Sequence, residues 1–530
     1  MNHVLAGLAA NPSLPPHLVD RLIAVTVADA GPDADGDADG DLARELAARA
    51  DLSHAQAVAL AARVAETAVP LAHAGRLTAA DIDPVSRPSA ALALLDAGTG
   101  DPGWARLFAA SPVVEHREKL AACPGLPAEV VATLAADTEV RVVAELALWT
   151  DSVTAARLAG HPHAEVRSAV AANEATPAAA LAALLTGEGL PPAERCLVCD
   201  VEPIPFVHAP GCPRVGCALR PGDSCDGAHE STLHELYRRA LSNPATPAAA
   251  VTGFVDHPSM LLREQLAARP DLPQLLHGRL AQDPCPGVRA KLAGNPAIDE
   301  ALIRLLATDR GHDVQRSLAH HPEVPLDVVD RLAGTARTGS TLLPRIAAAT
   351  AAEIRELAAS PNPALRMLLA ERHDLPADVR DALAADSDAK VLKSVARHPG
   401  LTDTQLLAMV DRHGARVLAK VAAAPDASPA LLERLVQQVP PVQKAFREVA
   451  RQPCATPTAL LACLADHQAA PIAAAHPSLP PRTIVDLLTH EDGRVVEAAA
   501  ANPSLPPTVM AQLVSQLTEP PSGPERDRLR

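Results

Sequence analysis

Aromatic side chains are almost absent from this chain of 530 residues, which has four Phe, two Trp and one Tyr, or 1% of the total. A compact enzyme normally buries many of these large side chains in its core. Because 48% of the residues are nevertheless hydrophobic, Ala, Leu and Val have to fill the core. This composition favours a long array of small, closely packed helices over several globular domains.

Positive charge and long apolar runs are also scarce. Lys and Arg number 47 against 63 Asp and Glu, and the formal net charge of −16 repels phosphate backbones. No basic stripe is visible along the sequence, so nucleic acid is not an expected partner. No apolar stretch approaches the length of a membrane span, and residues 1–10 lack the basic lead-in of a secretory signal. We therefore expect a cytoplasmic protein without membrane contact.

Proline, by contrast, is abundant and regularly placed. Many of the 51 prolines follow a residue that recurs every 26 positions, most often Asn, Arg or His, which we call the lead residue of its unit. The same phrase, Asn-Pro-Ser-Leu-Pro-Pro, starts at Asn11 and at Asn502. A fixed period of this size predicts stacked supersecondary units. The clearest series of lead residues is Asn243, Arg269, Asn295 and His321, continued farther on by Arg372, His398 and Ala424.

Each unit carries two apolar stripes with helical spacing. After Asn295, four apolar positions three or four residues apart form one stripe, and two more form a second stripe beyond a polar break. The pattern predicts two short helices per unit, each with one buried face that only a neighbouring unit can cover. These positions are Ile298, Leu302, Ile303, Leu306, Val314 and Leu318.

The repeated phrase, followed by a Leu-rich helix and a Val-Arg step, resembles the leucine-rich repeat variant family over most of the chain. The step occurs in Glu139-Val140-Arg141, Glu165-Val166-Arg167 and Gly287-Val288-Arg289. The resemblance implies a right-handed superhelix of alternating α and 3₁₀ helices without a sheet. In some members of that family a cysteine-ligated 4Fe–4S cluster lies beside the repeats. Armadillo and HEAT repeats, which also use a Val-Arg step, are the nearest alternative class.

Two segments interrupt the repeats. The first is acidic, and Asp35, Asp37 and Asp39 match the first ligand positions of an EF-hand loop, but the twelfth position is Leu46 in place of the bidentate acid. A solvated acidic linker is therefore the better interpretation. The second is rich in cysteine. The predicted order is a first repeat (1–28), an acidic linker (29–41), N-terminal helical repeats that are partly irregular (42–186), a Cys-rich metal-binding insert (187–236), C-terminal helical repeats (237–517) and a polar tail (518–530).

The insert contains five of the nine cysteines. A C-x2-C pair lets two thiolates converge on one metal from a tight turn, and a C-x4-C pair follows after twelve intervening residues. The segment is rich in Pro and Gly and has too few apolar residues to fold by packing, so a metal would have to hold it together. The candidate ligands are Cys196, Cys199, Cys212, Cys217, Cys225 and His229.

The residues alone leave zinc and iron–sulfur open, because four cysteines at these spacings are ordinary for a closed zinc site. The pentapeptide Cys225-Asp226-Gly227-Ala228-His229 is similar to the closing motif of the CDGSH iron–sulfur proteins, in which the Cys and the His ligate a 2Fe–2S cluster. This chain lacks the Cys-x-Cys partner of that motif. The two resemblances together favour an iron–sulfur cluster narrowly, with Zn²⁺ as the alternative. One cysteine, Cys217 or Cys225, is then left over.

The remaining cysteines and the repeat histidines fit structural roles. Small buried side chains suit the repeat positions of the four other cysteines, and the histidines replace the lead Asn of a unit, where hydrogen bonding between turns is expected. No phosphate loop, nucleophile elbow or informative carboxylate pair is present. These residues are Cys123, Cys285, Cys454 and Cys463, and His161, His321, His398 and His476.

The sequence therefore predicts an all-α helical repeat solenoid with a loop-rich metal-binding insert, and a non-enzymatic scaffold that binds another protein through an extended concave face. An alternative is an iron–sulfur protein for electron transfer or redox sensing, in which the array positions the cluster. A HEAT-like nucleic-acid binder is a weaker alternative, since acidic balance and scarce stacking aromatics argue against it.

Overall fold

The computed structural model describes residues 2–26, 37–196, 229–336 and 338–518. Throughout these ranges the regular elements are helices, and the one β-type contact is an isolated parallel bridge between His163 and Arg195. The predicted all-α repeat fold is confirmed. In the same ranges no helix is both apolar enough and long enough to cross a bilayer.

The unit that follows Asn295 shows how the sequence produces the repeat. Its first stripe forms α20 (Glu300–Leu306), which begins at Asp299, whose side chain accepts the backbone N–H of Leu302. Its second stripe forms α21 (His312–Ala319), which buries Val314, Leu318 and Ala319. Neither helix is long enough to be stable alone. Stacking of the apolar faces of successive units therefore supplies the core.

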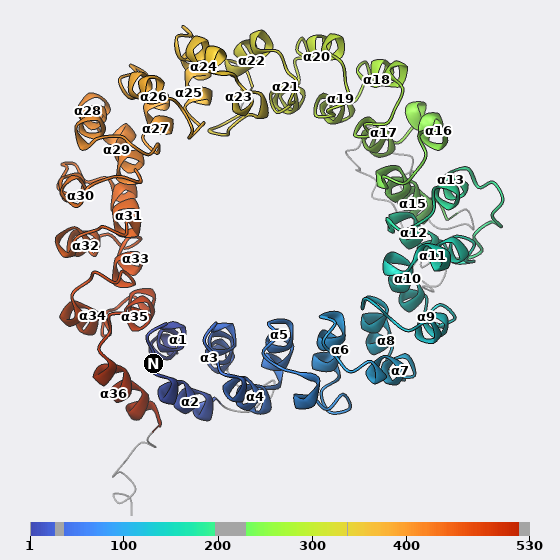
Figure 1. The fold of residues 1–530 in the computed structure, drawn as a ribbon, viewed down its shortest axis with the longest axis horizontal. Helices are drawn as coiled ribbons and strands as arrows, with labels where there is room; N and C mark the ends of the chain where they lie inside the picture. The colour runs from blue at the N-terminus through green and yellow to red at the C-terminus, as the bar shows by residue number, and fades with distance from the viewer. Residues whose placement is uncertain (1, 27–36, 197–228, 337, 519–530) are drawn as a thin grey trace, which may run out of the picture. The chain divides into compact units, whose positions relative to one another are not determined.

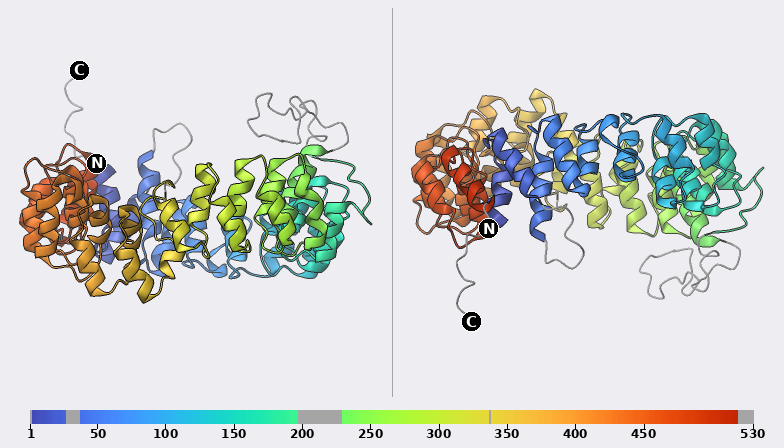
Figure 2. Two further views of the ribbon diagram at one scale, coloured as in Figure 1. Left: turned by 90° about the horizontal axis from the view of Figure 1, so that it is seen from above. Right: turned by 90° about the horizontal axis from the view of Figure 1, so that it is seen from below.

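The chain divides into two compact units, and each of them contains two rows of helices (Figures 1 and 2). Unit 1 consists of residues 1–93 and 373–530. Its first row lies on the inner side of the curve that the unit's helices follow, and its second row lies outside. The first row is α27 (Ala389–Val395), α29 (Ala415–Ala422), α31 (Gln443–Arg451), α33 (Ala470–Ala474), α35 (Gly493–Ala500), α1 (Asn2–Ala10) and α3 (Asp37–Ala48). The second row is α26 (Ala377–Ala384), α28 (Asp403–His413), α30 (Pro429–Val436), α32 (Pro457–Cys463), α34 (Pro481–Leu487), α36 (Pro507–Thr518), α2 (Pro16–Val25) and α4 (His54–Arg63). The stretch that follows α4 contains η1 (Ala65–Thr67), α5 (Ala68–His73), η2 (Ala79–Asp81) and the start of α6 (Pro88–Asp96).

Unit 2 consists of residues 94–372 and repeats the two-row arrangement. Three further helices, α23 (Pro344–Ala347), α24 (Ala351–Ala358) and α25 (Pro363–Leu369), form where the sequence period slips. The first row is α8 (Val114–Ala121), α10 (Val140–Trp149), α12 (Ala164–Ala172), α15 (Glu230–Ser242), α17 (Met260–Ala267), α19 (Pro286–Ala293) and α21. The second row is α7 (Gly103–Ala109), α9 (Ala128–Leu134), α11 (Ser152–Leu158), α13 (Ala178–Thr186), α16 (Ala248–Val251) with η3 (Thr252–Asp256), α18 (Gln274–Leu280), α20 and α22 (Leu326–Ala333).

The second-row elements differ from what the family resemblance implies. Most of them are α-helices, and among the described residues 3₁₀ helix is limited to η1, η2 and η3. Two predicted boundaries also differ from the helices. Helix α3 begins at Asp37, inside the segment assigned to the acidic linker, and α15 begins at Glu230, inside the segment assigned to the insert. The apolar positions Leu42 and Leu46, which are both buried, explain why α3 packs as part of the array.

Polar lead residues join most units to the unit before. The Asn295 side-chain amide donates to the carbonyl oxygens of Ala267 and Arg269 at 2.9 and 2.8 Å, and its own oxygen accepts the N–H of Ala297. Buried Asn thereby uses both donors and its acceptor. His321 makes the equivalent bond through Nε2 to the Asn295 carbonyl at 2.9 Å. The expected structural role of the lead histidines is confirmed at His321.

Other predicted lead histidines behave in two ways. His476 bonds through Nε2 to the carbonyl of Gln452 at 3.0 Å, as expected. His398 is buried and stacks on His373 with ring centroids 5.0 Å apart. The assignment of His161 was wrong, because His161 lies in the other turn of its unit, ahead of α12. The lead residue there is Asn173, which donates to Ala147 and Thr150.

The insert does not interrupt this chain of bonds. Asn243 lies 70 residues after Asn173, yet its amide donates to the carbonyls of Ala171 and Asn173 at 3.0 and 2.9 Å. Because successive leads such as Asn295 and His321 are 26 apart, the insert adds 70 − 26 = 44 residues to one unit. Helix α15 packs directly on α12 as the next member of the row.

Within unit 1 the same bonds join the two ends of the sequence. Asn11 donates to the carbonyls of Ala500 and Asn502 at 2.9 and 2.8 Å, in the way that Asn502 donates to Ala474 and His476. Helix α1 packs on α35 so closely that a Cβ at Gly7 would lie 2.2 Å from the Glu497 carbonyl oxygen. The first unit of the sequence therefore takes the place on α35 that a following unit would take. We call this contact the terminal joint.

Arginine at the fourth residue of several first-row helices makes a second connection, found in unit 2. Arg289 donates to the Asp283 carbonyl in the preceding turn and pairs with Asp309, 20 residues later, at 2.6 Å. Burial works to raise the pKa of Asp309, but the hydrogen bonds from Arg289 and from the Gly311 N–H outweigh it and hold the pKa below its usual value. We call this arrangement the arginine latch. It recurs at Arg117 with Asp137 and at Arg263 with Asp283.

The three Val-Arg steps of the sequence are not equivalent. Arg167 and Arg289 are the fourth residues of α12 and α19 and turn inward, whereas Arg141 is the second residue of α10 and pairs with Glu115 at the surface. Val143 takes the fourth position in α10 and is buried. The same dipeptide thus falls in two registers, which the sequence pattern does not distinguish.

Candidate metal centre

The outgoing stem of the insert is held by α12. After α13 ends, residues 191–196 run back along the N-terminal end of α12, where the backbone N–H of Ala164 donates to the Arg195 carbonyl at 2.9 Å. The N–H of Glu194 donates to the Pro162 carbonyl at 2.8 Å. Cys196 follows directly and has no solvent exposure. The first predicted ligand therefore enters the insert from a fixed, buried position.

Arg167 of α12 also holds the outgoing stem. Its guanidinium donates to the Pro191 carbonyl at 2.7 Å and to the Pro192 carbonyl at 3.4 Å. Burial lowers the pKa of Arg167, against a smaller raising effect of Glu194. In other units the arginine at this fourth position pairs with an aspartate, whereas here it binds backbone carbonyls of the stem. Sequence reasoning identified Arg167 as part of a repeat signature and missed this second role.

The returning stem ends at His229, the last residue before α15. His229 is 3% exposed and has a φ of 54°, a left-handed conformation that is uncommon outside glycine. Its Nε2 lies 3.2 Å from the Ala193 carbonyl oxygen. Because a carbonyl oxygen only accepts, Nε2 is the donor in this bond. Metal-bound histidines are commonly oriented in this way by a carbonyl.

Hydrogen bonds connect the returning stem and α15 to the outgoing stem and α12. Thr232, in the first turn of α15, donates to Glu165 of α12 at 2.9 Å, and the His229–Ala193 bond joins the returning stem to the outgoing one. A cavity of about 530 Å³ lies beside the stems and is lined by Arg167, Leu184, Pro191, Ala193, His229 and Tyr237. The stem contacts were not predictable from motifs, since Thr232 and Glu165 stand 67 residues apart.

Two of the six predicted ligands lie in this described region. Cys196 and His229 provide a thiol and an imidazole, both buried, at the two ends of the insert. Cys199, Cys212, Cys217 and Cys225 lie outside the described residues. Among the side chains that the structure does describe, no group of three or more His, Cys, Asp or Glu is arranged to hold a metal ion. The donor types and burial of Cys196 and His229 fit a Cys- and His-ligated metal.

The four other cysteines fall into two groups. Cys123, Cys285 and Cys463 are buried, as predicted, and burial raises the pKa of Cys123 and of Cys463 to about 12. These two thiols therefore stay protonated at neutral pH and are poor ligands and nucleophiles. The prediction was wrong for Cys454, which is exposed and donates to the Ala427 carbonyl. Its place in a turn after the lead residue Gln452 explains the difference.

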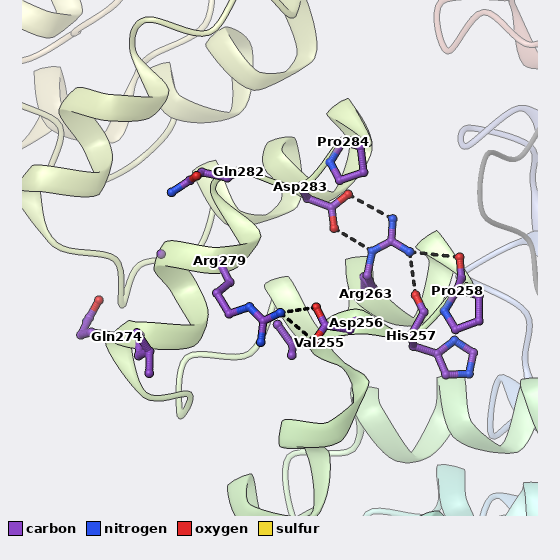
Figure 3. A pocket seen from close by; sticks show the side chains of 12 residues that line it. Val255, Asp256, His257, Pro258, Arg263, Gln274, Arg279, Gln282, Asp283 and Pro284 are labelled. Atoms are coloured by element: carbon purple, nitrogen blue, oxygen red, sulfur yellow. Dashed lines mark hydrogen bonds and ion pairs between the residues drawn. The ribbon is translucent and has the colours of Figure 1, made fainter.

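An open groove of about 1100 Å³ lies in unit 2 between η3, α17 and α18 (Figure 3). Its charged side chains are engaged with one another. Arg263 pairs with Asp283 and donates to the carbonyls of His257 and Pro258, and Arg279 pairs with Asp256 at 2.7 Å. Burial lowers the pKa of His257, and Arg263 adds to that effect. The groove thus provides shape but no free charge.

Comparisons with known proteins add little to these observations. No family model matches the chain, and no curated protein matches it. One solved structure that it matches is the crystal structure of an engineered protein from the Northeast Structural Genomics Consortium. The match has 16% sequence identity and a TM-score of 0.14, and it covers 92% of this chain and 97% of that chain.

Proposed function

We propose that the protein is a non-enzymatic scaffold that binds another protein through the surface of its repeats, and that its insert carries a structural or redox-sensitive metal centre. The observation that supports the proposal most is the continuity of the array across the insert. Because Asn243 bonds to Ala171 and Asn173 as if the units were consecutive, the array folds without help from the insert. The insert is then an added site, held by stems that the array positions. A cytoplasmic location is part of the proposal.

The metal centre would be held at its base by Cys196 and His229, with further donors from residues 197–228. An iron–sulfur cluster is the narrowly preferred group, with Zn²⁺ as the alternative. Either group, when bound, would cross-link a segment that has few apolar residues to pack. The chain's own contribution is to bury the Cys196 thiol and to orient the His229 ring through the Ala193 carbonyl.

Anaerobic purification followed by metal analysis and an absorption spectrum tests the metal centre. We expect bound metal in the wild-type protein and a loss of metal in Cys196→Ser, with unchanged helical circular dichroism. Cys454→Ser, an exposed cysteine in unit 1, is the matched control and should keep its metal. A colourless protein that contains zinc rules out the preferred iron–sulfur cluster, and with it the electron-transfer or redox-sensing alternative.

Affinity capture from the native cytosol tests the scaffold. We expect a specific protein partner that binds the wild type and the Cys454→Ser control equally. A protein that contains neither metal nor a captured partner contradicts the proposal. Reversible reduction of a cluster in a protein that captures no partner would favour the electron-transfer or redox-sensing alternative instead.

A further inference from the structure

Three successive first-row helices of unit 1 carry a group of positive side chains that is not apparent in the sequence. Helices α27, α29 and α31 pack side by side, and Glu448 is the one acidic residue in their sequences. Four of the chain's six lysines lie on them. We call this group the cationic face, and it consists of Lys390, Lys393, Arg416, Lys420, Lys444 and Arg447.

The helix pattern explains why these side chains share one face. In α29 the buried positions are Val417, Leu418, Val421 and Ala422, which leaves Arg416 and Lys420, one turn apart, toward solvent. Lys390 and Lys444 are the second residues of α27 and α31, as Arg416 is of α29. Because the three helices lie in one row, their second residues form a line of cations across it.

The cations of this face are not used within the described part of the chain. No ion pair or side-chain hydrogen bond of the six is found among the described residues, and Glu448 pairs instead with Arg451 at 3.0 Å. By contrast Arg263, Arg289 and Arg117 of unit 2 are each held by an aspartate. Unpaired like charges side by side repel one another and contribute nothing to folding. Their charge is therefore available to a ligand.

The length of the cationic face limits the ligands that can bind to it. Neighbouring helices pack about 8–10 Å apart, so the line of second residues spans about 16–20 Å, the length of about five or six extended residues. Helix α33, which follows α31 in the row, carries no charge and presents half-buried Pro471 and Ile472. The cationic face therefore ends at an uncharged helix and does not continue as a track.

An acidic protein segment matches these limits better than nucleic acid does. A polynucleotide extends its charge beyond so short a face, toward a chain with a formal net charge of −16. Single strands also need aromatic side chains on which bases stack, and Phe446 is the one aromatic residue of the three helices. We propose that the cationic face binds a short acidic segment of a protein partner. The inference rests on the proposed scaffold function and names the chemistry of its partner.

Fluorescence anisotropy with the full chain tests the assignment. The probe is a labelled peptide of alternating Glu and Asp long enough to cross three helices, compared with a Gln and Asn peptide of equal length. We expect the acidic peptide alone to bind, and its affinity to fall between about 50 and 200 mM salt. The triple variant Lys390→Glu, Arg416→Glu, Lys444→Glu should weaken binding more than about tenfold.

A matched variant controls for the change in net charge. Lys291→Glu, Arg310→Glu, Arg331→Glu reverses three exposed cations of unit 2 and should leave the affinity unchanged. No binding of the acidic peptide, or equal loss in both triple variants, overturns the proposal. Tighter binding of single-stranded or duplex DNA that depends on the same three cations also overturns it, in favour of a nucleic-acid surface. If the cationic-face variant still captures the native partner in full, this inference fails while the scaffold function stands.

Discussion

Units 1 and 2 use the same repeat, but they place their positive side chains differently. In unit 2 the fourth residue of α8, α17 and α19 is an arginine that reaches back to the turn and across to an aspartate. In unit 1 the fourth residue of α27 and α29 is a buried leucine, Leu392 or Leu418, and the cations stand at neighbouring positions toward solvent.

The difference shows that the residue at one helical position goes together with whether the cations of that helix are held in an ion pair or stand toward solvent. A latched arginine satisfies buried carbonyls, and it can be removed only by leaving a buried carboxylate without its partner. A buried leucine fills the same space without charge, so the surface cations of α27 and α29 are not needed as ion-pair partners within the fold.

The largest expected effect comes from breaking a latch. Arg263→Ala leaves the buried Asp283 without its partner, and we expect a loss of about 3–5 kcal/mol in the free energy of unfolding. Urea denaturation followed by circular dichroism measures it, and hydrogen exchange over α17 and α19 locates it. Arg263→Leu with Asp283→Asn, which imitates unit 1, should recover a large part of the loss. A double variant as unstable as Arg263→Ala would contradict the latch.

The lead asparagines provide a comparison in which the two units should behave alike. Asn243→Ala in unit 2 and Asn11→Ala in unit 1 each remove two hydrogen bonds to buried carbonyls, which costs about 1–3 kcal/mol. Hydrogen exchange should show α15 exposed in the first variant and α1 in the second. Because no peptide bond crosses the terminal joint, Asn11→Ala should open α1 without unfolding α35. Unchanged protection of α1 would show that the joint is held by other contacts.

Acidification should lower the stability that His321 contributes to unit 2, and this effect is smaller. Burial lowers the pKa of His321 below the 6.5 of a free histidine, and it outweighs the hydrogen bond to the Asn295 carbonyl and the charge of Glu323, which both raise the pKa. The ring accepts the Glu323 N–H at Nδ1, which a neutral imidazole can do. The unfolded chain then binds more protons, so this contribution is complete above pH 6.5 and is lost as the pH falls below it. Urea midpoints from pH 7.5 downward should fall less in His321→Asn. An identical slope in both proteins would contradict it.

The smallest effect is expected on the cationic face. Lys390→Gln, Arg416→Gln, Lys444→Gln removes three unpaired surface charges and should change the free energy of unfolding by less than about 0.5 kcal/mol. Urea denaturation at low and high salt measures it, and relief of repulsion predicts a slight gain at low salt. A loss comparable to that of Arg263→Ala would show that these cations have structural partners after all.

The repeat was predictable from the sequence because its signals are local. The lead Asn, the proline that follows it and the apolar spacing of Ile298, Leu302 and Leu306 lie within one turn or two of each other, and they produced the two-helix unit. Burial of Cys123, Cys285 and Cys463 followed from the same spacing. The registers of Arg141 and Arg167 were not predictable, since a dipeptide does not state which residue begins its helix.

The metal centre itself stays a prediction, and the contacts that hold the stems beside it were not predictable from the sequence. Cysteine spacing identified the insert, whereas the stems depend on Arg167, Glu165 and Thr232, which lie in units that come together only in the fold. Of the predicted ligands, Cys196 and His229 are buried where the stems meet, and the other four remain predictions.

By itself the sequence determined the helices, the period of the array and the place where it is interrupted, because these depend on residues a few positions apart. Only the tertiary structure decided that Asn11 bonds to Asn502, that α15 follows α12 in the row, and that Lys390, Arg416 and Lys444 form one face. The physical reason is stacking. Residues one repeat or a whole chain apart become neighbours when apolar faces are buried, so a charge pattern that is dispersed along the chain becomes continuous on the surface.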